Sequence, residues 1–349
     1  MKFAVGKCKK YSKYVVFQVQ EQSEDEGKIV GMFTSKDKPC DTDVYTPTLI
    51  SDTPCQVCGN TRLGGCSHSE RLCNGKPGQA CKTCSQMEID YSCTTKSKQY
   101  GNYAGMNDIP GAKDIYNNYA GNDGDLGRDG AFQGKKVIVL WLCYSGTESE
   151  TNIRKVLSTK GFSVDFYTAK NLPSAKALSV MLQTANQLWL VAEEKILLNE
   201  DYYKIIIDFY KKGKGLYLLG DNAPFFADVN VISQKLFGTE LKGDYIGDKV
   251  IGVSEKQNDV GIIKGHLMST GICNFYEGIT ISNVEPKGGL KPLVYSSDGK
   301  VAAAYFDKFG RRLLIDGGFT RLYFKWDTAG TDRYVKNAAV WLANIERFN

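Results

Sequence analysis

Histidine is scarce in this sequence of 349 residues, which contains only His68 and His266. Mechanisms that pair a nucleophile with a histidine base therefore have few residues to draw on. Long apolar runs are also missing, because no stretch approaches the roughly 18 consecutive apolar residues needed to cross a bilayer. The opening residues, MKFAVGKCKKYSKYVVF, carry too short an apolar stretch between lysines for a signal peptide. We expect a soluble, cytoplasmic protein that does not bind membranes.

A strong charge of one sign is absent as well. The 44 basic and 39 acidic side chains leave a net charge of +5. The one basic group, around Lys7–Lys13, is followed by an acidic run at Glu21–Glu26. This balance leaves no electrostatic footprint for a nucleic acid, so none is expected as a partner. The 42% hydrophobic content is ordinary for a globular protein, and the length accommodates two domains.

Composition divides the chain into four parts. They are residues 1–50, 51–95, 96–134 and 135–349. The first part holds two alternating stretches, Tyr14–Val19 and Ile29–Phe33, that predict short strands. The second is poor in large apolar side chains, so it needs a bound metal or disulfide bonds to fold. The third is rich in Gly, Asn, Asp and Tyr and predicts a linker, and the fourth has the regular pattern of an α/β domain.

Cysteine is abundant and clustered. Seven of the 11 cysteines lie between Cys55 and Cys93, and they include two Cys-x-x-Cys pairs. In a reducing compartment such pairs favour metal over disulfides. Zinc prefers four thiolate or imidazole ligands, so eight candidates are enough for about two closed sites. The predicted ligands are Cys55, Cys58, Cys66, His68, Cys73, Cys81, Cys84 and Cys93, with Cys40 as an alternative to Cys93.

The spacing of this cluster resembles the metal-binding module attached to von Willebrand-type domains in tellurite-resistance-associated systems. His68 stands where that module has a cysteine. The alternative is a secreted domain held together by disulfides. Catalytic zinc is not expected, because ligands are plentiful and no H-E-x-x-H pattern supplies a base. Calcium is not expected either: Asn122–Gly130 is oxygen-rich but lacks the terminal bidentate Glu of an EF-hand, and a solvated turn is the default.

Strands and helices alternate after Gly134. Apolar runs predict strands at Lys136–Leu142, Ser163–Thr168, Leu188–Ala192 and Leu216–Leu219. Amphipathic stretches predict helices from Thr147 to Gly161, over Ser174–Leu182 and over Asp201–Lys212, the first opened by a capping box of Thr147 and Glu150. Hairpin patterns predict antiparallel strands at Pro292–Ser296, Val301–Phe306 and Arg311–Asp316, before a closing helix over Asp332–Ile345. These elements predict a flavodoxin-like, doubly wound, mainly parallel sheet with antiparallel additions.

Several segments of this domain resemble the class I glutamine amidotransferase-like superfamily, in a non-catalytic branch. They are KVIVLWL, QLWLVAEE, GLYLLGDNAPFF, the loop Gly265–Gly271, GRRLLIDGGF and KNAAVWLANI. Catalytic members carry a nucleophilic cysteine in the turn after the fourth strand, and here Asp221 stands in that turn. His266 does not form the His-x-Glu pair of the active relatives, and the resemblance implies a structural role for its loop.

Ligands of open α/β sheets bind outside the carboxyl ends of the strands. We therefore expect one crevice lined by Cys143, Ser145, Glu193, Asp221 and Asn222. The alternative is a purely structural role for both residues: Asp221 accepts hydrogen bonds from backbone N–H groups at the start of the following helix, and Cys143 is a small hydrophobic side chain in the core.

The leading interpretation is a non-catalytic, zinc-binding interaction or structural protein, a pseudoenzyme whose amidotransferase-like domain binds a protein partner, further copies of itself or a small ligand. One rival is a hydrolase in which Asp221 acts with Glu193 or Glu194 through an activated water. The other is a subunit of a larger assembly, suggested by the 20 tyrosines and the aromatic linker.

Overall fold

The computed structural model describes residues 113–344 apart from 119–120, 123–124, 128, 144–145, 255, 257, 265, 324 and 327, together with the backbone of four short strands near the N-terminus. These strands are β1 (Lys2–Cys8), β2 (Lys13–Val19), β3 (Ile29–Gly31) and β4 (Thr48–Leu49). They form an antiparallel sheet in the order β3-β2-β1-β4. The two strands predicted in this part of the chain, β2 and β3, are among them.

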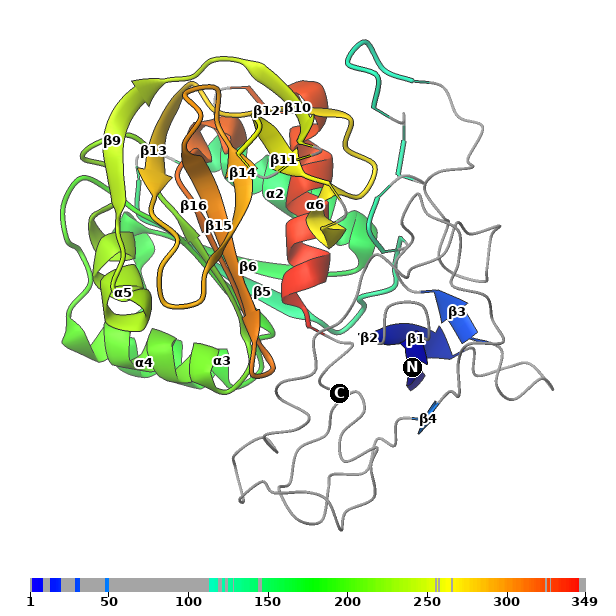
Figure 1. The fold of residues 1–349 in the computed structure, drawn as a ribbon. Coiled ribbons are helices and arrows are strands. Elements are labelled where there is room, and N and C mark those ends of the chain that lie inside the picture. The colour runs from blue at the N-terminus through cyan, green and yellow to red at the C-terminus, as the bar shows by residue number, and fades with distance from the viewer. Residues whose placement is uncertain are drawn as a thin grey trace.

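A ten-stranded sheet forms the centre of the remaining structure (Figure 1). Its strands are β5 (Lys136–Trp141), β6 (Ser163–Thr168), β7 (Gln187–Val191), β8 (Gly215–Leu219), β10 (Val250–Ser254), β11 (Gly261–Ile263), β12 (Asn274–Tyr276), β14 (Lys291–Tyr295), β15 (Val301–Lys308) and β16 (Arg311–Asp316). Their order is β12-β10-β11-β14-β15-β16-β8-β7-β5-β6. The five strands β6-β5-β7-β8-β16 run parallel, in the order typical of flavodoxin-like folds. The predicted mixed α/β fold with a mostly parallel sheet is therefore confirmed.

Strands β14, β15 and β16 form the predicted antiparallel ladder. It continues the parallel part outward from β16, and β11 joins its far edge antiparallel to β14. Two further strands, β9 (Leu241–Ile246) and β13 (Thr280–Val284), form a separate antiparallel pair. This pair lies beside the ladder, since β13 contacts β15. It was not predicted, and it becomes important for the site.

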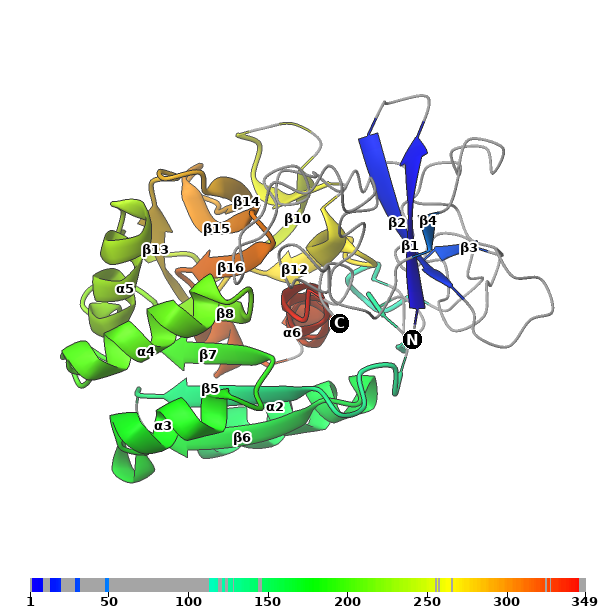
Figure 2. The same cartoon turned by 90° about the horizontal axis from the view of Figure 1, so that it is seen from below.

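Helices cover both faces of the sheet (Figures 1 and 2). They are α2 (Thr147–Lys160), α3 (Ala175–Leu182), α4 (Glu200–Lys211), α5 (Ala227–Phe237) and α6 (Thr331–Leu342), with short 3-10 turns at η4 (Ala169–Asn171), η5 (Leu267–Ser269), η6 (Phe319–Leu322) and η7 (Thr328–Gly330). Side chains of β5 alternate between the two layers: Val137 and Val139 pack with α2 and α6, whereas Ile138 and Leu140 pack with α3, α4 and α5. A strand buried on both faces explains the continuous apolar run in its sequence.

Two local predictions about the helices need correction. Thr147 is the first residue of α2 rather than its cap: the cap is Gly146, and no side chain bonds to it. The Glu150 carboxylate instead forms an ion pair with Arg154, one turn along the helix. Gly161 does end α2 in the left-handed conformation, as predicted. On α4 the buried residues include Tyr203, whereas the neighbouring Tyr202 is only partly buried, although the sequence pattern would place Tyr202 on the apolar face of the helix.

The described residues of the predicted linker pack against the α/β domain. Leu126 and Phe132 are both buried in the core layer of α2 and α6. Asn118 is buried too, and its side-chain oxygen accepts hydrogen bonds from the backbone N–H groups of Cys273 and Asn274 at 2.8 and 2.9 Å. This segment therefore lies across the end of β12 and is hydrogen-bonded to it.

Candidate functional site at the carboxyl edge of the sheet

Strands β5, β7 and β8 are neighbours and run parallel, so their carboxyl ends share one edge of the sheet. Cys143, Glu193 and Asp221 follow these three strands, and sequence reasoning placed all of them at this edge. Ser145 lies outside the described residues. The side chains nevertheless have different surroundings.

Asp221 is buried, with 2% of its surface exposed. Its Oδ2 atom accepts a hydrogen bond from the Thr280 hydroxyl on β13 at 2.9 Å. Its Oδ1 atom is also buried and has no hydrogen-bond partner among the described residues. Asp221 does not cap the following helix, since α5 begins only at Ala227 and no side chain caps it. The Asp221 side chain therefore points into the protein.

Burial raises the pKa of the Asp221 carboxyl to about 8. The hydrogen bond from Thr280 and the positive charge of Arg321 act in the opposite direction, but they do not overcome the cost of removing the charge from water. The carboxyl is therefore mostly protonated at neutral pH. A protonated acid is a poor nucleophile, although it can still donate a proton.

A buried ionic network lies next to Asp221, and sequence reasoning missed it. Its centre is Asp316, the last residue of β16, which is fully buried and ion-paired with Arg321. The hydroxyls of Tyr217 and Tyr334 donate to its Oδ2 atom at 3.0 and 2.8 Å. Arg321 also donates to the backbone oxygen of Glu277 at 2.6 Å. The available signal was an acidic residue at a strand end followed by two glycines.

Those two glycines allow the segment 277–282 to cover the network. A Cβ atom on Gly317 would collide with the backbone oxygen of Ser282, and one on Gly318 would lie 2.6 Å from that of Glu277. Main-chain hydrogen bonding follows from this close approach, because the Ser282 N–H donates to Gly317 at 2.8 Å. Thr320 adds a side-chain link by accepting from the Ile279 N–H at 3.0 Å. The chain thus places its own backbone over the carboxyl ends of β8 and β16.

The other predicted crevice residues are dispersed along the edge. Cys143 is 1% exposed and belongs to the hydrophobic core. Glu193 is half-buried, and its carboxylate accepts a hydrogen bond from the Glu194 N–H at 3.1 Å. The Glu194 side chain is exposed and lies 3.4 Å from the Lys195 ammonium. Asn222 donates at 2.9 Å to the exposed Asp244 on β9.

The loop that carries His266 is hydrogen-bonded to α6. The Asn337 side chain donates to the backbone oxygens of Met268 and Thr270 at 3.0 and 2.7 Å. Its own oxygen accepts from the Leu126 N–H at 2.7 Å. Burial lowers the pKa of His266 to about 3, so this imidazole is neutral at ordinary pH. These contacts fit the structural role that the resemblance implied for the loop.

The acidic residues of the calcium-like segment 122–130 are bound by cations of the chain itself. The Asp125 carboxylate lies 2.9 Å from Lys160 and 2.7 Å from Arg333, and all three side chains are buried or nearly so. Lys336 lies 3.3 Å from the same carboxylate. Asp129 binds Lys160 as well, at 2.7 Å. Two ammonium groups and a guanidinium thus neutralise the carboxylates that a calcium ion would need.

The eight predicted zinc ligands all lie outside the described residues. Within the part of the chain that is described, no cluster of three or more His, Cys, Asp or Glu side chains is arranged to hold a metal. In that same part, every helix is too short or too polar to span a membrane.

Comparison with known proteins gives no matching family model and no matching curated protein sequence. Among solved structures, the chain is similar to a β-galactosidase from Rahnella sp. R3, with 10% identity, a TM-score of 0.42, and coverage of 59% of this chain and 31% of that one. It is similar to the carbohydrate deacetylase Agd3 at 15% identity and a TM-score of 0.37, covering 60% and 32%. It is also similar to the glutaminase domain of Trypanosoma brucei CTPS at 8% identity and a TM-score of 0.37, covering 62% and 100%.

The chain therefore spans about a third of the length of the β-galactosidase and of the deacetylase. At these identities and TM-scores, the likenesses assign neither a family nor an activity to it.

Proposed function

We propose that the α/β domain is a non-catalytic binding domain of the glutamine amidotransferase-like kind, joined to a zinc-stabilised module in residues 51–95. The observation that supports the first part most directly is the burial of Asp221 in the nucleophile's position. Segment 277–282 lies over the carboxyl ends of the strands where relatives would carry out chemistry. A domain that keeps such a frame without an exposed nucleophile is suited to binding a protein partner, another copy or a small ligand.

A turnover assay tests the absence of catalysis. The purified chain is incubated with glutamine and with p-nitrophenyl esters, in parallel with Asp221→Ala and with the control Asp244→Ala. Asp244 is an exposed carboxylate next to the same turn, so its removal leaves the buried network intact. We expect no turnover above buffer by any of the three proteins. Turnover that is lost in Asp221→Ala and kept in the control would contradict the proposal.

The zinc module is tested separately by elemental analysis and a thiol count under denaturing, non-reducing conditions. We expect about two zinc ions per chain and free thiols at the cluster, because two closed sites use eight ligands. Absence of metal together with few free thiols would instead identify a disulfide-bonded domain. Neither result depends on what the α/β domain binds.

A hydrolase remains the second candidate, and the raised pKa of Asp221 favours it. Strongly shifted carboxyls often occur at catalytic sites, where a neutral acid can donate a proton. In that case Asp221 would be the acid, and Glu193 or Glu194 would activate water after segment 277–282 had moved. The same turnover assay decides, with Glu193→Gln added: loss of activity in both variants supports the hydrolase.

A further inference from the structure

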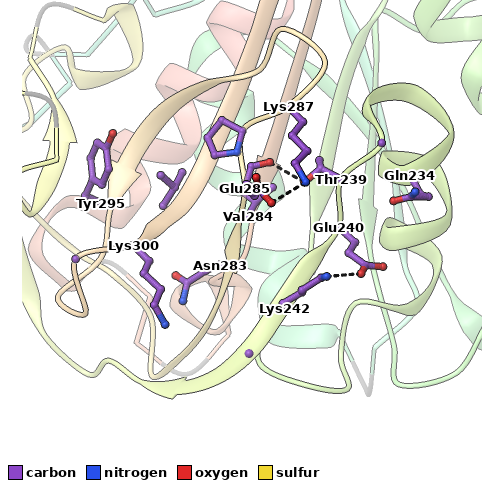
Figure 3. A pocket seen from close by; sticks show the side chains of 15 residues that line it. Gln234, Thr239, Glu240, Lys242, Asn283, Val284, Glu285, Lys287, Tyr295 and Lys300 are labelled. Atoms are coloured by element: carbon purple, nitrogen blue, oxygen red, sulfur yellow. Dashed lines mark hydrogen bonds and ion pairs between the residues drawn. The ribbon is translucent and has the colours of Figure 1, made fainter.

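A hollow of about 630 Å³ lies beside the β9–β13 pair (Figure 3). Four segments line it: the end of α5, strand β9, the residues from Asn283 to Lys287, and the turn between β14 and β15. None of the predicted crevice residues is among its lining residues. Its volume falls within the roughly 300–1,000 Å³ typical of small-molecule sites.

Four of the five charged side chains that line this hollow form two ion pairs, and the fifth, Lys300, lies 3.9 Å from the Asp298 carboxylate. Lys242 lies 2.8 Å from Glu240, and Lys287 lies 2.8 Å from Glu285. All four side chains are among the lining residues, and dashed lines mark both pairs in Figure 3. An anionic ligand would have to compete with the glutamates, and a cationic ligand with the lysines. A hydroxyl group can accept from an ammonium and donate to a carboxylate, so it suits such a rim without separating the pairs.

Further polar side chains at the rim are held in place by a small network. Asn283 donates to the Asp298 carboxylate at 2.8 Å, and the Ser296 hydroxyl donates to the same carboxylate at 2.7 Å. Burial acts to raise the pKa of Asp298, but these hydrogen bonds and the charge of Lys300 outweigh it and lower the pKa. The ionised carboxylate therefore fixes the Asn283 amide and the turn that carries Lys300. Preorganised donors of this kind lose little entropy when a ligand binds.

Three buried apolar side chains lie beneath the hollow. Val284, Tyr295 and Val301 line it and are 3%, 4% and 9% exposed. Gln234, on the exposed side of α5, adds an amide to the lining. These side chains expose too little surface to hold a large apolar group, so a ligand that fits is compact, neutral and rich in hydroxyl groups, as a sugar is.

We propose that this hollow is a binding site for a neutral carbohydrate unit, with its hydroxyls among Lys300, Asn283 and Gln234. The inference rests on the proposed function, because it names the ligand class of a non-catalytic binding domain. It also moves the binding site from the carboxyl edge of the sheet to the β9–β13 side.

Titration with single sugars tests the proposal. The full chain is titrated with D-glucose, D-galactose, D-mannose, D-xylose and N-acetylglucosamine by saturation-transfer NMR and calorimetry, with inorganic phosphate as the charged probe. We expect at least one sugar to bind with a dissociation constant of about 1–10 mM, as suits a ligand of this size in an open site. We expect Lys300→Met and Gln234→Ala to weaken binding about fivefold or more. Both positions are exposed, so these variants should fold normally.

Lys235→Met is the matched control. Lys235 lies on α5 next to Gln234, but it pairs with Glu200 and is not a lining residue. Sugar binding that is weakened in the two site variants and kept in Lys235→Met supports the proposal. Absence of binding by every sugar, equal binding by all variants, or phosphate binding tighter than any sugar would overturn it. Chemical conversion of a bound sugar would leave the site standing and refute the non-catalytic function instead.

Discussion

Replacing Asp221 with asparagine should change how the stability of the protein depends on pH. The pKa of this carboxyl rises from 3.8 to about 8 on folding because the group is buried. Between these values the folded chain keeps its proton while the unfolded chain loses it, so unfolding is increasingly favoured as the pH rises. Each pH unit lowers the free energy of unfolding by about 1.4 kcal/mol, which amounts to about 5 kcal/mol from pH 4 to pH 8. Asparagine resembles the protonated acid in shape and does not ionise.

The measurement is chemical unfolding of the wild type and Asp221→Asn at several pH values between 4 and 9, followed by tryptophan fluorescence and circular dichroism. Other titrating groups are common to both proteins and cancel in the difference. We expect the variant to gain stability over the wild type progressively as the pH rises, reaching about 5 kcal/mol near pH 8. Asp244→Asn, which removes an exposed carboxylate nearby, should show no such trend.

Parallel stability profiles for the wild type and Asp221→Asn would refute this reasoning. They would mean that the carboxyl is ionised in the folded protein, and hence that water or a cation reaches it. That outcome would also remove the main support for a sealed carboxyl edge, and with it the neutral acid on which the hydrolase alternative depends. An Asp244→Asn profile that followed Asp221→Asn would show that general surface charge, rather than burial, controls the trend.

Two further substitutions probe the contacts that hold the outer segments to the domain. Asp125→Ala should destabilise the fold by about 3–5 kcal/mol, because it leaves the buried cations of Lys160 and Arg333 without their shared carboxylate, and thermal unfolding would measure the loss. Asn337→Ala should cost about 2–4 kcal/mol, because it leaves the buried backbone oxygens of Met268 and Thr270 without their donor, and hydrogen exchange of the 266–270 loop should quicken with it. A change under 1 kcal/mol in either variant would show that the contact contributes little.

The parallel half of the sheet could be predicted because its signals are local. Runs such as those of β5 and β8 are buried on both faces, so nearly every residue in them is apolar and the pattern needs no knowledge of partners. The same holds for the hairpin between β15 and β16, whose turn lies at Phe309 and Gly310. For elements with a strong periodicity of their own, most predicted ends therefore lie within one or two residues of the observed ends.

Elements whose burial depends on distant parts of the chain were missed. Strand β9 exposes most of its side chains and carries Lys242 and Asp244, so its sequence resembles a loop. Its partner β13 is separated from it by more than thirty residues that include three other strands. The capping box at Thr147 was wrong for a related reason. The Glu150 side chain had an alternative partner in Arg154, and a local motif does not reveal which contact is preferred.

The position of Asp221 illustrates the limit of the sequence most clearly. Strand order places the residue at the carboxyl edge, and that much follows from β8 alone. Whether the edge is open depends on Thr280, which is far away in the sequence, and on Gly317 and Gly318, which admit the backbone that carries it. With the edge closed in this way, the β9–β13 pair that closes it also forms a wall of the hollow described above. The strand pair that covers the carboxyl edge therefore also lines the hollow for which we propose carbohydrate binding.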